Sequence, residues 1–250
     1  MNEQYSQSDR SDKFNSPQIE LEDAIGKPDL SKVESKDPSL IDGYKIIYNK
    51  EIPLDIKIET KDGPKDLASY ELIGCKILSD AANPEDTPTR VKFELSWERD
   101  LNFHYFNIVD EETFAVIKKK QNLNLEFAQY CNLVTKICDD CLKTPDTYIG
   151  EFTIQNDGVS KLLFIKGSDF KYLDLLSLEF TKSPEDMIQK HMLYRFAYLK
   201  AKISYYKKAI KTAGDVILDC NPDVVTPMLD NYDNYKLDID KFFSNKKVEN

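Results

Sequence analysis

Histidine is nearly absent from this chain, whose 250 residues include only His104 and His191. The first falls in a strand pattern and the second lies early in a predicted long helix. We therefore expect neither a histidine-dependent catalytic triad nor a histidine-rich metal site. Glycine is also scarce, with eight residues, and the GxGxxG, GxxxxGK[ST], GxSxG and HExxH motifs are all missing. The sequence predicts a protein that is not an enzyme and that uses no metal and no cofactor.

Long hydrophobic runs are missing as well. No apolar run reaches the roughly 18 residues of a membrane span, and the polar start MNEQYSQSDR lacks the apolar stretch of a secretory signal. Five cysteines, an odd number without framework spacing, indicate a reducing compartment, so we expect a cytoplasmic protein. Cys138 and Cys141 have the spacing of thiol redox sites, but both lie on the apolar stripe of a predicted helix, which favours packing. A thiol enzyme stays open as an alternative.

An excess of positive charge is also lacking. The 34 basic and 44 acidic residues leave a formal charge of −10, which argues against general nucleic-acid binding. Residues 1–42 are acidic, serine-rich and poor in large apolar groups, which predicts a disordered acidic leader. Residues 184–213 hold seven basic and two acidic residues, whereas residues 215–243 hold seven aspartates and two lysines. One hypothesis is that an acidic flexible tail, residues 215–250, lies along this basic helix or a neighbour's; solvated faces are the alternative.

What the chain does contain is a strand-rich segment, residues 43–182. Apolar and charged residues alternate over 54–58 and 91–97, as in half-buried strands, and further strands are expected at 103–108, 148–155, 159–166 and up to Phe180. Asn156-Asp157-Gly158 is typical of a hairpin turn. Two helices are predicted between these strands, one capped by Asp110 and one over residues 128–143. We expect an α+β fold, a small β-sandwich or barrel head with inserted helices.

A long helix, residues 183–214, follows the head as a stalk. Ser183-Pro184 is a typical helix start, and we expect Gly214 to end the helix. Its apolar residues keep a heptad spacing for about three heptads, which favours a short coiled coil; a lone helix packed on its own head is the alternative. The residues predicted to pair are Met192, Phe196, Leu199, Ile203, Tyr206 and Ile210.

Two runs of the sequence together resemble a known family. They are VKFELSWERDLNFHYFNIVDEETFAVIKKKQNLNLEFAQYCNLVTKIC and SDFKYLDLLSLEFTKSPEDMIQKHM. In order, they contain an acidic helix start with Phe114, a predicted strand from Gln121 to Phe127, and a Phe-Lys-x-Leu-x-x-Leu-Ser-Leu stretch at 170–178. This pattern, over roughly 44–213, resembles the head domain of the spindle-assembly-abnormal-six family, which builds the ninefold cartwheel of centrioles. It more closely resembles the short paralogues without the long coiled coil, associated with basal-body or apical-complex structures.

The resemblance implies a barrel-like head, a coiled-coil stalk, and heads that associate through a bulky apolar residue placed in a pocket of the opposite head. Phe170, between Asp169 and Lys171, matches that residue; burial in its own core is the alternative. The receiving pocket is expected at Phe127, Cys131 and Val134. The implied function is a homo-oligomeric cytoskeletal scaffold that also binds other cytoskeletal or centriolar proteins. A DNA end-joining repair scaffold, with the same architecture and a DNA-binding basic stalk helix, is the alternative.

Overall fold

The computed structural model of this chain describes residues 28–81, 86–155 and 158–220. The chain divides into one unit spanning Val33–Ala197 and a second made of Met1–Lys32 and Tyr198–Asn250. All seven strands of the described residues lie in the first unit. None of the described helices is long and apolar enough to span a bilayer.

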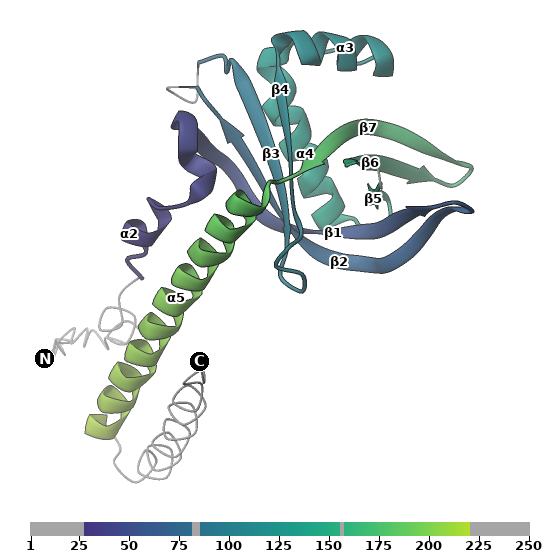
Figure 1. Ribbon diagram of the computed structural model, residues 1–250. Helices are drawn as coiled ribbons and strands as arrows, with labels where there is room; N and C mark the ends of the chain where they lie inside the picture. Colours follow the sequence, from purple (N-terminus) through teal and green to yellow (C-terminus); the bar gives the residue numbers. More distant parts are fainter. Residues whose placement is uncertain (1–27, 82–85, 156–157, 221–250) are drawn as a thin grey trace, which may run out of the picture. The chain divides into compact units, whose positions relative to one another are not determined.

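The strands form a closed barrel in the order β1–β2–β3–β4–β7–β6–β5 (Figure 1). Neighbouring strands are antiparallel except β1 and β5, which pair in parallel through residues 55–58 and 151–154 and so close the barrel. The fold is therefore the expected α+β head. The strand bounds are Lys45–Thr60 for β1, Gly63–Ser79 for β2, Arg90–Trp97 for β3, His104–Asp110 for β4, Tyr148–Ile154 for β5, Val159–Ser168 for β6 and Lys171–Lys182 for β7.

Aromatic and aliphatic side chains of the strands fill the barrel interior. The Phe180 ring lies edge-on to two others, with centroids 5.3 Å from Phe93 and 5.8 Å from Phe152, a favoured arrangement for aromatic pairs. Gly150 allows β5 to approach this core closely, because a Cβ at that position would overlap Leu54 Cδ2. The alternation seen in the sequence thus becomes a continuous apolar core.

Two helices lie between β4 and β5, as predicted: α3 (Glu111–Gln121) and α4 (Tyr130–Lys143). Asp110 caps α3, because its carboxylate accepts a hydrogen bond from the Thr113 backbone N–H at 2.8 Å. The apolar stripe of α4 is buried and contributes to the core, with Cys138 and Cys141 among its residues. The burial of these two thiols agrees with the packing role that the sequence predicts.

The strand predicted from Gln121 to Phe127 does not form. Gln121 is the last residue of α3, Asn122 adopts a left-handed conformation, and Phe127–Gln129 forms the 3-10 turn η2. The alternating pattern arises instead from a helix end followed by a turn. Gln121 nevertheless bonds to the barrel as a strand would, because its side-chain amide accepts from Ser177 N at 2.8 Å and donates to Ser177 O at 2.7 Å.

The predicted disordered leader extends too far along the chain. A short helix α2 (Ser31–Glu34) and a 3-10 segment η1 (Pro38–Gly43) precede β1. Asp37, Pro38 and Ser39 are buried, and the Asp37 carboxylate caps the Ser39 N–H at 2.9 Å. Buried polar contacts therefore order a segment whose composition alone indicated disorder. Residues 1–27 of the predicted leader lie outside the described residues.

The stalk helix α5 (Glu185–Cys220) continues past Gly214, where the sequence predicted its end. A glycine inside a helix costs about 1 kcal/mol relative to alanine, which is too little to terminate a helix that has good helix formers before it. The next proline is Pro222. The acidic tail beyond residue 220, the hypothesis that it lies along the basic helix, and the Asn156-Asp157 turn residues lie outside the described residues.

Candidate functional site

An exposed aromatic side chain stands at the tip of the β6–β7 hairpin. Phe170 is 97% exposed and follows Asp169 in the turn between Ser168 and Lys171. The Ser168 hydroxyl donates to the Lys171 carbonyl at 2.7 Å, which closes the turn beneath the ring. The ring therefore contributes nothing to the core of its own barrel, and the alternative of self-burial does not hold.

The start of β7 extends this exposed apolar surface. Tyr172 is 71% exposed and Leu173 is also exposed, although neither residue was expected as a site from the sequence. The signal available in the sequence was the group of apolar residues, Phe170, Tyr172 and Leu173, soon after Gly167-Ser168. Together these three define the hairpin-tip surface, residues 170, 172 and 173.

The pocket predicted to receive such a tip is not open at the expected residues. Phe127, Cys131 and Val134 are all buried within the hydrophobic core cluster. The Phe127 ring packs against the ring of Phe114 on α3, at a centroid distance of 5.5 Å. Residues of the same head therefore already cover Phe127. In this conformation the three residues are part of the core and do not form a receiving surface.

The predicted stalk-pairing residues are largely uncovered. Met192 is half-buried, whereas the other five side chains are exposed. The exposed residues are Phe196, Leu199, Ile203, Tyr206 and Ile210, with exposed fractions between 46% and 65%. Apolar residues at heptad positions that stay exposed in one chain are typical of a surface buried by a second helix.

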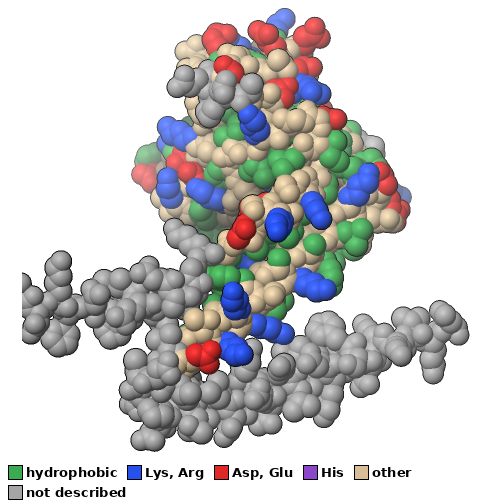
Figure 2. Space-filling view, turned by 90° about the vertical axis from the view of Figure 1, so that its left-hand side faces the viewer, with side chains coloured by type: hydrophobic (Ala, Val, Ile, Leu, Met, Phe, Trp, Pro, Cys, Tyr) green, Lys and Arg blue, Asp and Glu red, His purple; other side chains and the backbone are tan. Residues whose placement is uncertain are grey.

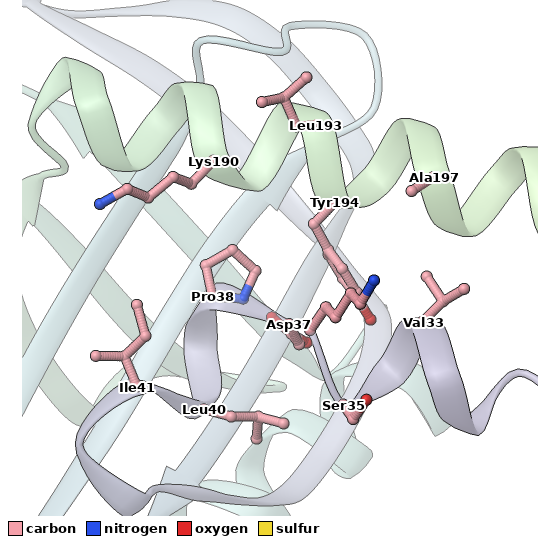
Figure 3. A pocket seen from close by; sticks show the side chains of 11 residues that line it. Val33, Ser35, Asp37, Pro38, Leu40, Ile41, Lys190, Leu193, Tyr194 and Ala197 are labelled. Atoms are coloured by element: carbon pink, nitrogen blue, oxygen red, sulfur yellow. The ribbon is translucent and has the colours of Figure 1, made fainter.

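A groove of about 630 Å³ lies between the segment that precedes β1 and the first part of α5. Figure 3 shows Leu193 and Tyr194 on the helix side and Pro38, Leu40 and Ile41 on the other side. The lining is mainly apolar, with two lysines at the groove. Among the described residues it is an open concave surface, in contrast to the buried residues predicted as a pocket.

A buried polar cluster lies beside this groove. Asp37 and Glu94 are 4% and 3% exposed, and each is paired with a lysine: Lys76 Nζ lies 2.6 Å from Asp37 Oδ2, and Lys92 Nζ lies 2.5 Å from Glu94 Oε1. Ser39 Oγ donates to Glu94 Oε2 at 2.5 Å. Burial by itself would raise the pKa of each carboxyl, but the lysines and hydrogen bonds hold both pKa values below the ordinary range.

The two histidines meet at this cluster, although 87 positions separate them in the sequence. Their rings stack with centroids 3.9 Å apart, and His104 Nδ1 lies 2.8 Å from Ser183 Oγ. Burial, followed by the neighbouring His191, lowers the pKa of His104 to about 3, and burial lowers the pKa of His191. Both imidazoles are therefore neutral at physiological pH. Distance along the sequence was no guide to their separation, because the barrel and α5 bring them together.

The face in Figure 2 displays no histidine among its coloured residues, in keeping with this burial; basic and hydrophobic side chains are intermixed there. With Glu94, the two histidines form the group of described residues whose ligand atoms could hold a metal ion, all lying within 4.8 Å of one another. Their position in the fold is fixed by β3, β4 and the second turn of α5.

The buried cysteines do not form a thiol active site. Burial raises the pKa of Cys75 well above its ordinary value and raises the pKa of Cys141 to about 12. Since the thiolate is the nucleophile, such thiols are unreactive. Cys138 is fully buried in the same core. These three thiols therefore contribute to the packing of the core.

A comparison with protein families matches residues 46–180 to the family described as the centriolar protein SAS N-terminal domain. The match covers more than half of the 250 residues and runs from the second residue of β1 into β7. Among curated proteins, the chain is 23% identical over 185 residues to a spindle assembly abnormal protein 6 homolog of Danio rerio. The alignment covers 70% of this chain but only 29% of that protein's length.

Solved structures share the fold. An N-terminal fragment of Leishmania SAS-6 with parts of its coiled-coil domain matches with a TM-score of 0.58 at 13% identity, over 72% of this chain and 98% of that one. An N-terminal coiled-coil dimer of C. elegans SAS-6 matches with a TM-score of 0.53 at 13% identity, over 67% and 98%. These likenesses show a common fold.

Proposed function

This chain belongs to the family of the centriolar protein SAS N-terminal domain, and on that premise we propose that it is a self-assembling scaffold of the centriolar cartwheel type. Its role is structural and not catalytic. The chain spans about 29% of the length of the curated relative that it matches. The role of that whole relative is therefore not transferred directly, and the scaffold role is our proposal for this chain. The single observation that supports it most is the 97% exposed Phe170 ring at the hairpin tip.

Assembly requires two different self-contacts, and the chain offers a surface for each. The first is the hairpin-tip surface, from which Phe170 enters a second head. An aromatic anchor that fills a pocket is the usual form of an interface hot spot. Asp169 and Lys171 flank the ring and would form the polar rim of that contact.

The second contact is the exposed apolar face of α5. We propose that it pairs with the same face of a second α5 in a short parallel coiled coil, and the C. elegans neighbour, itself a coiled-coil dimer, supports this pairing. Phe196 and Ile203 fall at one heptad position, and Leu199 and Tyr206 at the other. With both contacts, each chain joins two neighbours, so the subunits form closed rings if the rotation closes and helical filaments if it does not.

Sedimentation of single and double variants tests this two-contact design. We expect wild-type protein to form species larger than a dimer as concentration rises, since weak contacts gain from repeated valency. Phe170→Glu removes the head contact and leaves stalk dimers, Ile203→Glu leaves head dimers, and the double variant is monomeric. Val116→Glu changes another exposed apolar residue, 66% exposed on α3, and serves as the matched control. Unchanged large species in the Phe170→Glu variant would contradict the proposed head contact.

The receiving surface on the second head can be located without assuming its residues. A photo-crosslinking phenylalanine analogue at position 170 reacts with whatever lies against the ring, and mass spectrometry of the crosslinked peptide identifies it. A crosslink to the groove beside α5 would identify the open surface as the receiving site. A crosslink to the helix region around Phe127 would instead identify the pocket predicted from the sequence. Loss of the crosslink on dilution shows that it joins two molecules.

The cellular location belongs to the same proposal. We propose that the protein lies in the cytoskeleton at centrioles or basal bodies, with the apical complex as the finer alternative. A fluorescent fusion expressed in the source cell should coincide with one of these structures, and a diffuse signal would contradict both. The family match favours a scaffold of this type over a DNA end-joining scaffold, and the acidic net charge weighs in the same direction.

A further inference from the structure

We propose that Glu94, His104 and His191 form a Zn²⁺ site that joins the barrel to the stalk helix. Each residue comes from a different element, namely β3, β4 and α5, and their ligand atoms lie within 4.8 Å of one another. All three side chains are at least 95% buried. A tetrahedral zinc ion with ligands at about 2.0–2.2 Å places them roughly 3.3 Å apart, so the three side chains have to rotate toward one another to close the site.

An unsatisfied ligand atom points to this use. His191 Nε2 is buried and has no hydrogen-bond partner among the described residues. Buried polar atoms are normally paired, so an orphaned imidazole nitrogen beside a second imidazole and a carboxylate needs a ligand that all three can share. A metal ion supplies that partner.

His104 already has the outer contact that zinc-bound histidines show. Its Nδ1 lies 2.8 Å from Ser183 Oγ, so a proton on Nδ1 donated to that hydroxyl leaves the Nε2 lone pair for a metal. Ser183 is itself held, because its backbone N–H donates to the His104 carbonyl at 2.9 Å. The ring is thus oriented by a residue just before the stalk helix begins.

The donor set selects the metal. Two imidazoles and one carboxylate are typical ligands of Zn²⁺, whereas Ca²⁺ and Mg²⁺ prefer sites made of oxygen atoms. Three protein ligands leave a fourth position, which a water molecule completes. The stacked rings must also tilt apart so that both nitrogen lone pairs point to one ion.

Lys92 is the group that the metal has to displace. Its ammonium contacts Glu94 Oε1, while Ser39 holds the other carboxylate oxygen. The Tyr44 ring lies 5.6 Å from Lys92 Nζ and offers the displaced ammonium a cation–π partner. Lys76 stays paired with Asp37. Displacement of one lysine contact weakens zinc binding without preventing it.

The test uses the full chain without a polyhistidine tag, so that its two histidines are the only ones present. Equilibrium dialysis against Zn²⁺ followed by elemental analysis should give one ion per chain, together with a higher melting temperature. We expect His191→Gln and Glu94→Gln to weaken binding at least tenfold and to lose the temperature rise. Ser183→Ala, which removes the outer partner of His104, should weaken binding about 10–100-fold.

Two further measurements keep the outcome decisive. Co²⁺ in place of zinc should give visible absorption without a thiolate charge-transfer band, because no cysteine is a ligand. If a variant fails to fold by circular dichroism, nitrogen NMR of the two wild-type histidines replaces it, and zinc must shift the Nε2 signals of both rings. Absence of stoichiometric binding, retained binding in a folded His191→Gln variant, a thiolate band, or unshifted histidine signals would each overturn the site.

Discussion

The Gln121 side chain substitutes for a missing strand, and its removal is a sharp test of the fold. Over the middle of β7, Ser177 pairs with Leu163 of β6, but β4 pairs with β7 only at Tyr105 and Phe106. The open edge at Ser177 is bonded by the Gln121 amide, which both donates to and accepts from the Ser177 backbone. This side chain therefore attaches the end of α3 to the barrel.

Gln121→Ala removes both hydrogen bonds and leaves a backbone donor and acceptor without a protein partner. Two net hydrogen bonds contribute about 1–3 kcal/mol. Because Gln121 and Ser177 are only partly buried, water replaces part of the loss. We expect the free energy of unfolding to fall by about 1–2 kcal/mol, near the lower end of that range. At about 2–4 °C per kcal/mol for a domain of this size, the melting temperature falls by about 2–8 °C.

Urea unfolding followed by circular dichroism measures the change. Gln121→Glu keeps the acceptor for the Ser177 N–H but places a second oxygen against the Ser177 carbonyl, so we expect at least the same loss. Lys120→Ala is the matched control, because it introduces the same alanine in the last turn of α3 at an exposed position. Its effect should stay within about 0.5 kcal/mol. If Gln121→Ala equals this control, the amide does not substitute for a strand.

Three more predictions concern the core, a helix cap and the buried thiols. Phe180→Ala should lower the free energy of unfolding by about 3–5 kcal/mol, because the ring is fully buried; Tyr172→Ala, on the exposed part of the same strand, should have little effect in the same urea experiment. Asp110→Ala should cost about 1 kcal/mol through loss of the α3 cap, and Asp110→Asn should restore most of it, as measured by melting temperature. Burial raises the pKa of Cys131 to about 11 and that of Cys141 to about 12, above the ordinary value of 9.0. The stability that these protonated thiols contribute is therefore complete below about pH 9 and is lost as the pH rises toward the raised pKa values. Unfolding measured over that range should depend less on pH in Cys141→Ala, and an equal slope in both proteins would contradict the assignment.

Local patterns in the sequence determined much of the fold. Alternating apolar residues predicted the strands, Asp110 and the acidic turn after it predicted the start of α3, and helical spacing predicted the buried stripe of α4. The exposure of Phe170 was also predictable, because an aromatic between charged residues beside a glycine turn has little core within reach. Each of these features depends on residues that are close together in the sequence. The local pattern of residue types is therefore enough to predict it.

The tertiary structure alone decided the contacts between distant residues. His104 and His191 stack only because α5 returns to the start of β4, and Gln121 meets Ser177 only because β7 is left with an open edge. Asp37, in a segment whose composition predicted disorder, is likewise buried, and it pairs there with Lys76 of β2. Such contacts depend on how the whole chain packs in three dimensions, and no periodicity or spacing along the sequence specifies which distant side chains become neighbours.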